Sequence, residues 1–347
     1  MADLVVRPLV AGEEELFDSM PDPLPQLRQV SYADGIAGGG YRPEHTWIAL
    51  LAGRVVGRAA WLLPPGSVGD PWLERFELDP MSTVGADAVA GGVPTVAGGV
   101  LTLGDGVPTV GVAPGLSGGL CGASAEVGAA LLSAAHEALG GPKLYYAALP
   151  AYWRRQPQVR AVAEVPMAAA RLAGLVERSE RLRFTWTGGP LPTPSGRLTF
   201  RPAIDSVEIN SLLARIAEPE VLTGAETARS VAGVELARDP LAWLSGPAES
   251  WRVALEGGEP VGLAAAAPDA CYPMIPYLGL LDDPARGGAA RGGLVLGELL
   301  ADVVAALAAG GAYEVVADVD AHRVAVVAEL ERTGFRRVRS RVLFAPA

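Results

Sequence analysis

Apolar and polar positions follow the same pattern at the start of the chain and again after its middle. DLVVRPL, residues 3–9, predicts a short strand, and the next segment has helical spacing with acidic residues in its first turn. RLTFRPA, residues 197–203, repeats the strand and is also followed by an acid-bearing helix. The pattern therefore predicts two halves that begin alike.

Both halves continue in one order of elements. TWIALLAGRVVGRAAWLL (46–63) predicts a hairpin turning at Ala52-Gly53-Arg54, and WRVALEGGEPVGLAAAA (251–267) echoes it. Beyond the hairpins the first half predicts strand 72–80, helix 126–139, strand 143–149, helix 165–181 and strand 182–186. The second half predicts strand 274–281, helix 293–309, strand 314–320, helix 323–333 and strand 336–344. Alternating strands and helices with hairpins indicate an α/β fold, more narrowly α+β with a mixed sheet.

A linker divides the halves. TGGPLPTPSG, residues 187–196, contains three prolines and three glycines, which favour neither helix nor strand. We therefore expect one domain over 1–190 and another over 191–347. Residues 82–122 are rich in Gly, Val and Ala, and we interpret them as an insertion with some strand character.

Composition narrows the classes of function. Hydrophobic residues make up 50% and the net charge is −11, so the chain can bury a core, and its acidic surface disfavours nucleic acid outside local arginine clusters. Two clusters occur, at 154–160 and 332–341. We interpret both as solvated faces, with contact to a phosphate-bearing donor as the alternative for the second. Two cysteines and three histidines are scattered, so we expect no disulfide framework and no metal. The acidic start and the glycine-broken stretch 106–125 favour a soluble, cytoplasmic protein.

The segment PYLGLLDDPARGGAARGGLVLGELL, with a later ELERTGFRRV, resembles the core of GNAT (Gcn5-related) acyltransferases. In that family a strand leads into an arginine- and glycine-containing loop and then a helix, whose start binds the pyrophosphate of CoA. The physical reason is that unpaired N–H groups at a helix start attract anions, and glycine allows close approach. The whole layout resembles tandem, two-domain GNAT proteins of actinomycete type.

The resemblance implies a donor-binding half over Leu278–Phe344. It places Arg291 at the loop arginine, with Arg286 as an alternative, and Arg323 at a position where the family has Asn. The implied donor-binding residues are Leu280, Leu281, Arg286, Arg291, Gly292, Gly293, Leu294, Val295, Gly297 and Arg323. In the first half Gly128 matches the motif, but Glu126 would oppose a pyrophosphate, so we interpret that copy as degenerate.

The chemistry that the resemblance implies is attack of an amine on a thioester, which needs a base, a carbonyl holder and an acid for the thiolate. A backbone N–H within Tyr277–Leu281 would hold the carbonyl. Asp282 and Asp318 are the candidate bases, with Asp283, Asp320 and His322 as further options. Tyr277 is the candidate acid, with Tyr272 beside it.

The function that follows is transfer of an acyl group from acyl-CoA, in the simplest case acetyl-CoA, to an amine of a small molecule, as in secondary metabolism. A first alternative is an aminoacyl-tRNA-dependent transferase on the same fold, which would make tRNA a partner. A second is a non-catalytic ligand-binding protein. No membrane partner is expected, and the sequence leaves the acceptor and the oligomeric state open.

Overall fold

The computed structural model describes residues 4–27, 30–79, 100–103, 107–112, 120–244, 246–268, 272–282 and 289–347, with backbone alone at 100–103, 107–112, 120–122 and 289–291. The chain forms two compact units. Unit 1 comprises Met1–Ser179 and Arg341–Ala347, and unit 2 comprises Glu180–Ser340. The expected domain boundary at 190/191 stays a prediction. The last residues of the chain complete the first unit.

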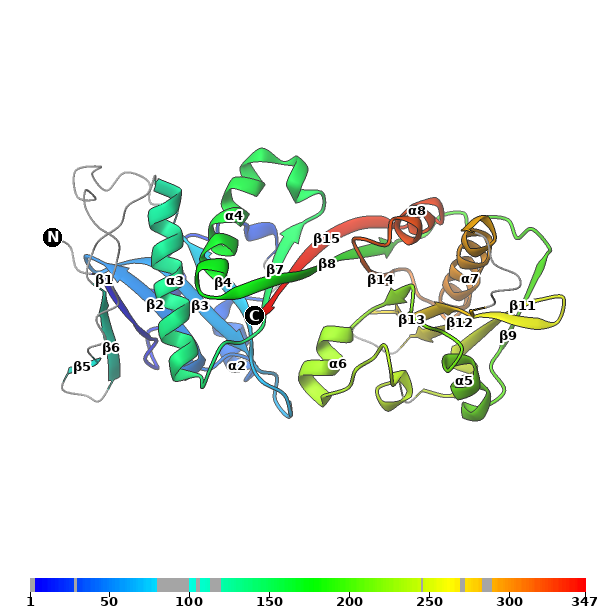
Figure 1. The fold of residues 1–347 in the computed structure, drawn as a ribbon, viewed down its shortest axis with the longest axis horizontal. Helices are drawn as coiled ribbons and strands as arrows, with labels where there is room; N and C mark the ends of the chain where they lie inside the picture. Colours follow the sequence, from blue (N-terminus) through cyan, green and yellow to red (C-terminus); the bar gives the residue numbers. More distant parts are fainter. Residues whose placement is uncertain are drawn as a thin grey trace. The chain divides into compact units, whose positions relative to one another are not determined.

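Unit 1 carries the first copy of the repeated element order (Figure 1). Its elements are β1 (Leu4–Pro8), α1 (Glu14–Asp18), η1 (Pro25–Leu27), α2 (Tyr32–Ala37), η2 (Pro43–His45), β2 (Thr46–Leu51), β3 (Arg54–Leu62), β4 (Trp72–Leu78), β5 (Val100–Leu103), β6 (Val107–Val112), α3 (Leu120–Ala138), β7 (Tyr145–Pro150), η3 (Trp153–Arg155), α4 (Pro157–Leu172) and β8 (Leu175–Trp186), which ends in unit 2. The sheet order is β5-β6-β1-β2-β3-β4-β7, followed by the end of β15.

Unit 2 repeats the arrangement. Its elements are β9 (Leu198–Pro202), α5 (Ser206–Leu213), β10 (Val221–Leu222), α6 (Ala225–Ala232), η4 (Pro240–Ala242), η5 (Ala248–Ser250), β11 (Trp251–Glu256), β12 (Glu259–Ala267), β13 (Met274–Leu280), α7 (Ala289–Ala309), β14 (Val315–Asp320), α8 (Val324–Arg332) and β15 (Arg336–Pro346), which ends in unit 1. The sheet order is β8-β14-β13-β12-β11-β9, and β10 pairs with β13. The mixed α/β sheet and the tandem arrangement are as predicted.

The same arginine–glutamate hydrogen bonds occur at the start of both units. Arg7 donates to Glu13 at 2.6 and 2.8 Å and to the carbonyl of Pro8, and Glu13 accepts from the Val10 N–H. Arg201 makes the same contacts with Glu208 and the Pro202 carbonyl, and Glu208 accepts from the Ile204 N–H. The repeated Arg-Pro of the sequence thus ties the first strand to the first helix twice.

The predicted hairpins are present in both units. Ala52 and Gly53 between β2 and β3 have φ of 51° and 77°, and Gly257 and Gly258 between β11 and β12 have φ of 60° and 88°. Two residues with positive φ give a tight turn whose twist matches that of the flanking strands. Glycine meets this requirement without strain, and only Ala52 adopts it with a side chain.

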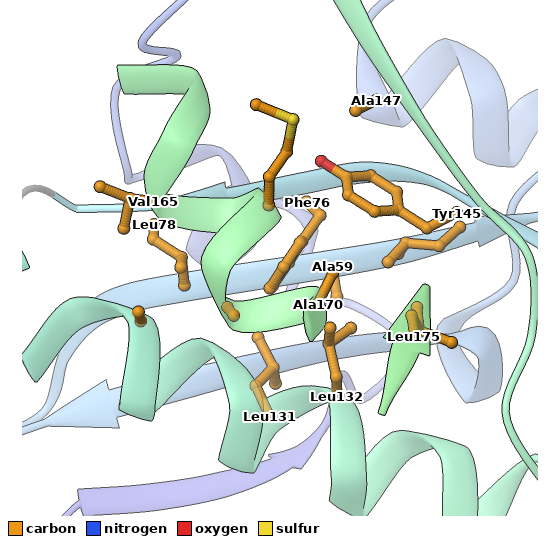
Figure 2. Close-up of a cluster of buried hydrophobic side chains, with 14 of the residues drawn as sticks. Ala59, Phe76, Leu78, Leu131, Leu132, Tyr145, Ala147, Val165, Ala170 and Leu175 are labelled. Atoms are coloured by element: carbon orange, nitrogen blue, oxygen red, sulfur yellow. The ribbon is translucent and has the colours of Figure 1, made fainter. Parts of the chain in front are cut away.

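Alternation along the strands gives each sheet two buried faces. In unit 1, α3 and α4 cover one face, where Leu131 and Leu132 converge on Phe76 and Leu78 of β4 (Figure 2). The other face buries a second cluster formed by Leu9, Phe17, Tyr32, Tyr41, Ile48 and Ala60. Each fully buried aliphatic side chain contributes about 1.5–3 kcal/mol, so these faces hold the unit together.

Two predicted elements need correction. The helix expected over 165–181 ends at Leu172, and β8 begins at Leu175, because Gly174 with φ 84° leaves the helical conformation between them. The helix expected over 126–139 begins earlier, at Leu120. In the insertion, β5 pairs antiparallel with β6, and β6 pairs with β1, which confirms its strand character there. The remainder of 82–122 lies outside the described residues.

Candidate functional site

One pair of parallel strands lies in the middle of each unit. In unit 2, β13 and β14 are paired only at Met274↔Val316, and in unit 1, β4 and β7 are paired only at Leu73↔Tyr145. Beyond that pair, the edge of β13 or β4 that faces its parallel neighbour no longer bonds to it. An unpaired strand edge presents N–H and C=O groups that can hold an extended chain or a polarised carbonyl.

In unit 2 this edge of β13 is already occupied. β10 pairs antiparallel with it at Val221↔Leu278 and Leu222↔Tyr277. The N–H of Glu220 donates to the Leu278 carbonyl at 2.7 Å, and that of Thr223 donates to the Pro276 carbonyl at 3.0 Å. The segment 220–223 therefore stands where β13 and β14 have separated.

Side chains fix this segment on both flanks. The Thr223 hydroxyl donates to the Ile275 carbonyl at 2.6 Å and accepts from the Asp318 N–H of β14 at 2.9 Å, so it bridges the two strands. Arg181 donates to the Leu222 carbonyl. Arg323, one of the predicted donor-binding residues, pairs instead with Glu220 at 2.9 Å and with Glu218 at 2.5 Å. These carboxylates raise the pKa of Arg323, against the opposing effect of its burial.

The expected loop Arg291–Gly297 is helical. It forms the first turns of α7, which begins at Ala289, and Val295 and Leu296 are buried in the core of unit 2. Arg286 lies outside the described residues, as does Asp283, and of Arg291 only the backbone is described. Gly292 has space around it, because a Cβ there would come no closer than 3.8 Å to Leu280.

Two of the predicted glycines serve helix packing. A Cβ on Gly293 would meet the Glu329 carboxylate at 3.2 Å, and one on Gly297 would meet it at 2.6 Å. Glu329 belongs to α8, is buried, and forms an ion pair with Arg332. The glycine pattern of the sequence is therefore explained in part by the close approach of α8 to α7.

The residues predicted along β13 point to different surroundings. Tyr277 is 1% exposed and packs on Trp251 with ring centroids 5.9 Å apart, and burial raises its pKa to about 12. Leu280 and Leu281 are part-buried and buried, and Leu294 is part-buried on α7. Asp282 is exposed, and its N–H donates to the Arg215 carbonyl.

Asp318 is buried in an ion pair. Arg183 on β8 donates to both of its carboxylate oxygens at 2.8 Å, and donates also to the Tyr272 hydroxyl at 2.7 Å. Burial lowers the pKa of Arg183, but the hydrogen bond and charge of Asp318 outweigh this and raise it above its usual range. Asp320 lies 3.5 Å from His322 and 3.6 Å from Arg181. The candidate bases on β14 thus all have cationic or imidazole neighbours.

The matching edge in unit 1 lies beside polar side chains that sequence reasoning missed. Arg75 on β4 is 7% exposed, donates to the Val30 carbonyl, and lies 5.3 Å from the centre of the Tyr41 ring. Tyr41 in turn donates to Glu74 at 2.5 Å. Among the described residues no carboxylate pairs with Arg75, and its Nη1 has no partner. The apolar–polar pattern of β4 does not predict a buried arginine, because the residues around Arg75 come from distant segments of the chain.

No group of three potential metal ligands occurs among the described residues. Within the same residues one helical stretch, Gly292–Ala309 of α7, is long and apolar enough to cross a membrane. Length and composition alone give this result, and a core helix gives it too. Leu299, Leu300, Val303 and Val304 of this stretch are fully buried in the core of unit 2.

The fold of this chain is similar to those of several solved structures. A GCN5-related N-acetyltransferase from Sphaerobacter thermophilus matches 98% of this chain and 94% of its own, at 14% identity and a TM-score of 0.51. The chain has a GNAT fold. A tandem GNAT protein from the clavulanic acid biosynthesis pathway covers 99% of both chains at 16% identity, but its TM-score of 0.38 is too low to add to the argument. No protein-family model and no curated protein matches the sequence.

Proposed function

We propose that this protein is an N-acyltransferase that moves an acyl group from acyl-CoA, in the simplest case acetyl-CoA, to an amine of a small molecule. The observation that carries the proposal is the pair of parallel strands that part after one residue pair, with a long helix leading from the first strand of the pair to the second in each unit. The likeness in fold to an N-acetyltransferase supports the same reaction.

The chemistry needs little more than a held thioester. The amine nitrogen attacks the carbonyl carbon, the C–S bond breaks, the thiolate takes a proton, and the nitrogen loses one. A backbone N–H at a strand edge can polarise the carbonyl, and the N–H groups at a helix start can meet the phosphates of CoA. The reaction itself does not depend on which unit holds the donor, and the base and acid expected at Asp282, Asp318 and Tyr277, like the expected donor-binding residues, stay predictions.

Acyl-CoA is favoured over aminoacyl-tRNA as the donor by the contacts of the basic cluster at 332–341. Arg332 pairs with Glu329, Arg337 with Glu180, and Arg341 lies over the Tyr146 ring. Arginines engaged by neighbouring side chains offer less charge to a polyanion. We propose as well that the protein is cytoplasmic and that it acts in secondary metabolism.

Calorimetry and thermal unfolding with acetyl-CoA test the donor. Ligand at 100 times Kd adds about 2.7 kcal/mol to the free energy of unfolding. ATP at equal concentration serves as the polyanion control, and thiol release during incubation with a panel of amines then reports turnover. Absence of any stabilisation at millimolar acetyl-CoA, with tRNA retarded on a gel at low salt, would replace this proposal by the tRNA-dependent one.

A further inference from the structure

The segment Glu220–Thr223 behaves as a built-in occupant of unit 2. It bonds to the carbonyls of Pro276 and Leu278, which face the gap between β13 and β14. The opposite edge of β13 pairs with β12, since Leu281 donates to the Val261 carbonyl. One edge of this strand is therefore paired with β12, and the other is covered over Pro276–Leu278 by the segment 220–223.

Side chains as well as backbone bonds hold this segment in place. If it left, the Thr223 hydroxyl would give up two bonds, and Arg323 would lose Glu220. Buried donors and acceptors without partners are costly, so departure of this segment is disfavoured. An acyl donor that would bond to the carbonyls of Pro276 and Leu278 has no place there.

Among the residues that the structure describes, none occupies the equivalent edge in unit 1. The backbone N–H of Asp79 donates to the Val56 carbonyl of β3. Because successive N–H groups of a strand point to opposite edges, those of Phe76 and Leu78 point toward the gap between β4 and β7. Leu78 lies opposite Gly57, just as Leu280 lies opposite Gly262, which makes the two edges equivalent. Within the described residues, no segment pairs with β4 on this side beyond Leu73.

The first turn of α3, the next helix in the chain, is also compatible with a bound anion. α3 begins at Leu120, so Glu126 lies in its second turn, behind the N–H groups of the first. The Ser124 hydroxyl donates to the Asp79 carbonyl at 3.1 Å and ties the helix to the end of β4. The Glu126 carboxylate, which we expected to repel a pyrophosphate, is therefore not at the start of the helix.

We propose that unit 1 holds the acyl donor at the free edge of β4, and that the built-in strand β10 makes unit 2 the unit without a donor. This rests on the proposed function and reverses the assignment of the degenerate copy. An extended arm with amide groups, like a peptide, can exchange N–H and C=O bonds with a strand edge.

Hydrogen exchange of the full chain with and without acetyl-CoA tests the assignment. In the free protein we expect slow exchange over 274–281 and faster exchange over 73–79. Acetyl-CoA should slow exchange over 73–79 at least tenfold and leave 274–281 unchanged. Equilibrium dialysis should give one acetyl-CoA per chain. Slowing confined to 274–281, or two molecules bound per chain, overturns the proposal.

Two variants separate the units. Leu78→Pro removes an N–H from the β4 edge and should weaken acetyl-CoA binding at least tenfold. Leu78→Ala shortens the same side chain but keeps the N–H, so it should weaken binding less than Leu78→Pro, with the fold of both verified by circular dichroism. Thr223→Val should speed exchange over 274–281 roughly fivefold to tenfold, as loss of a hydrogen bond predicts, and leave acetyl-CoA affinity within twofold. Thr223→Ser restores slow exchange.

The failures of the two proposals are distinguishable. If wild type binds no acetyl-CoA, the proposed function and the donor assignment both fail, while slow exchange over 274–281 still shows a closed edge in unit 2. If acetyl-CoA binds and Thr223→Val abolishes its binding, the function stands and the assignment to unit 1 is wrong.

Discussion

His136 sits on α3 as a buried, uncharged imidazole. It is 4% exposed, its ring meets the Trp61 ring edge-on at 5.9 Å, and its Nε2 has no partner. Burial lowers its pKa to about 4, with a further contribution from Lys143. The imidazole in the folded protein therefore stays neutral at pH values where the unfolded chain is protonated.

The consequence is a stability that depends on pH between about 6.5 and 4. The unfolded state binds the proton first as the pH falls, so the free energy of unfolding decreases through this window. Urea unfolding at pH 7.5 and 5.0 should show wild type losing about 1–2 kcal/mol more than His136→Leu. Equal losses in both proteins would mean that the imidazole takes up its proton without cost.

Asp318 offers a residue-scale test of structure against catalysis. Because Arg183 donates to both carboxylate oxygens, Asp318→Asn leaves a part-buried guanidinium without its partner. We expect Asp318→Asn to lower the free energy of unfolding by about 3 kcal/mol. Adding Arg183→Met to this variant should restore most of the loss, which a double-mutant cycle measures. A general base would instead give unchanged stability and lost turnover.

At the scale of elements, Gly128 decides how closely α3 approaches the sheet. A Cβ there would lie 2.5 Å from Leu78, 2.7 Å from the Ala169 Cβ and 3.1 Å from Phe76. Gly128→Ala should therefore cost about 1–3 kcal/mol through overpacking, measured by urea unfolding. Gly292→Ala in α7 is the control, with its nearest neighbour at 3.8 Å, and should be neutral or stabilising by up to about 1 kcal/mol.

Elements with a strong period were predictable from the sequence. The hairpins, the central strands and the long helices follow from apolar spacing and from turn residues such as Gly257-Gly258. The strand β8 was missed at its start because Val165–Arg181 reads as one helical run until Gly174 breaks it. β10 was beyond prediction, since two residues show no period and their partner strand lies some fifty residues further on.

The candidate site could be predicted in outline and not in its occupancy. The order of strand, glycine-rich segment and helix indicated the fold, and similarity to an N-acetyltransferase structure bears that out. Which edge is free depends on pairings between distant segments, such as Thr223 with Pro276. The same limit hid Arg75, whose neighbours Val30 and Tyr41 come from other parts of the unit.

At the scale of the whole molecule, each unit has its own core, and the segment 335–344 contributes to both. Phe344 is fully buried in unit 1 and stacks on Tyr145 with centroids 5.6 Å apart, while Phe335 is buried in unit 2. Phe344→Ala should cost about 3–5 kcal/mol and speed hydrogen exchange over 131–147, but not over 299–319. Phe335→Ala should do the reverse. Identical effects on both regions would mean that the units unfold as one.

Completion of unit 1 by Arg341–Ala347 has a consequence for synthesis in the cell. Residues 1–179 are synthesised first, yet Val342 and Phe344 of their core are added only after all of unit 2 has been synthesised. At about 5–20 residues per second, the first unit waits on the order of ten to thirty seconds with its core unfinished. A chaperone bound to the nascent chain during that interval would act on unit 1, and a synthetic peptide of residues 336–347 added in trans would shorten the wait.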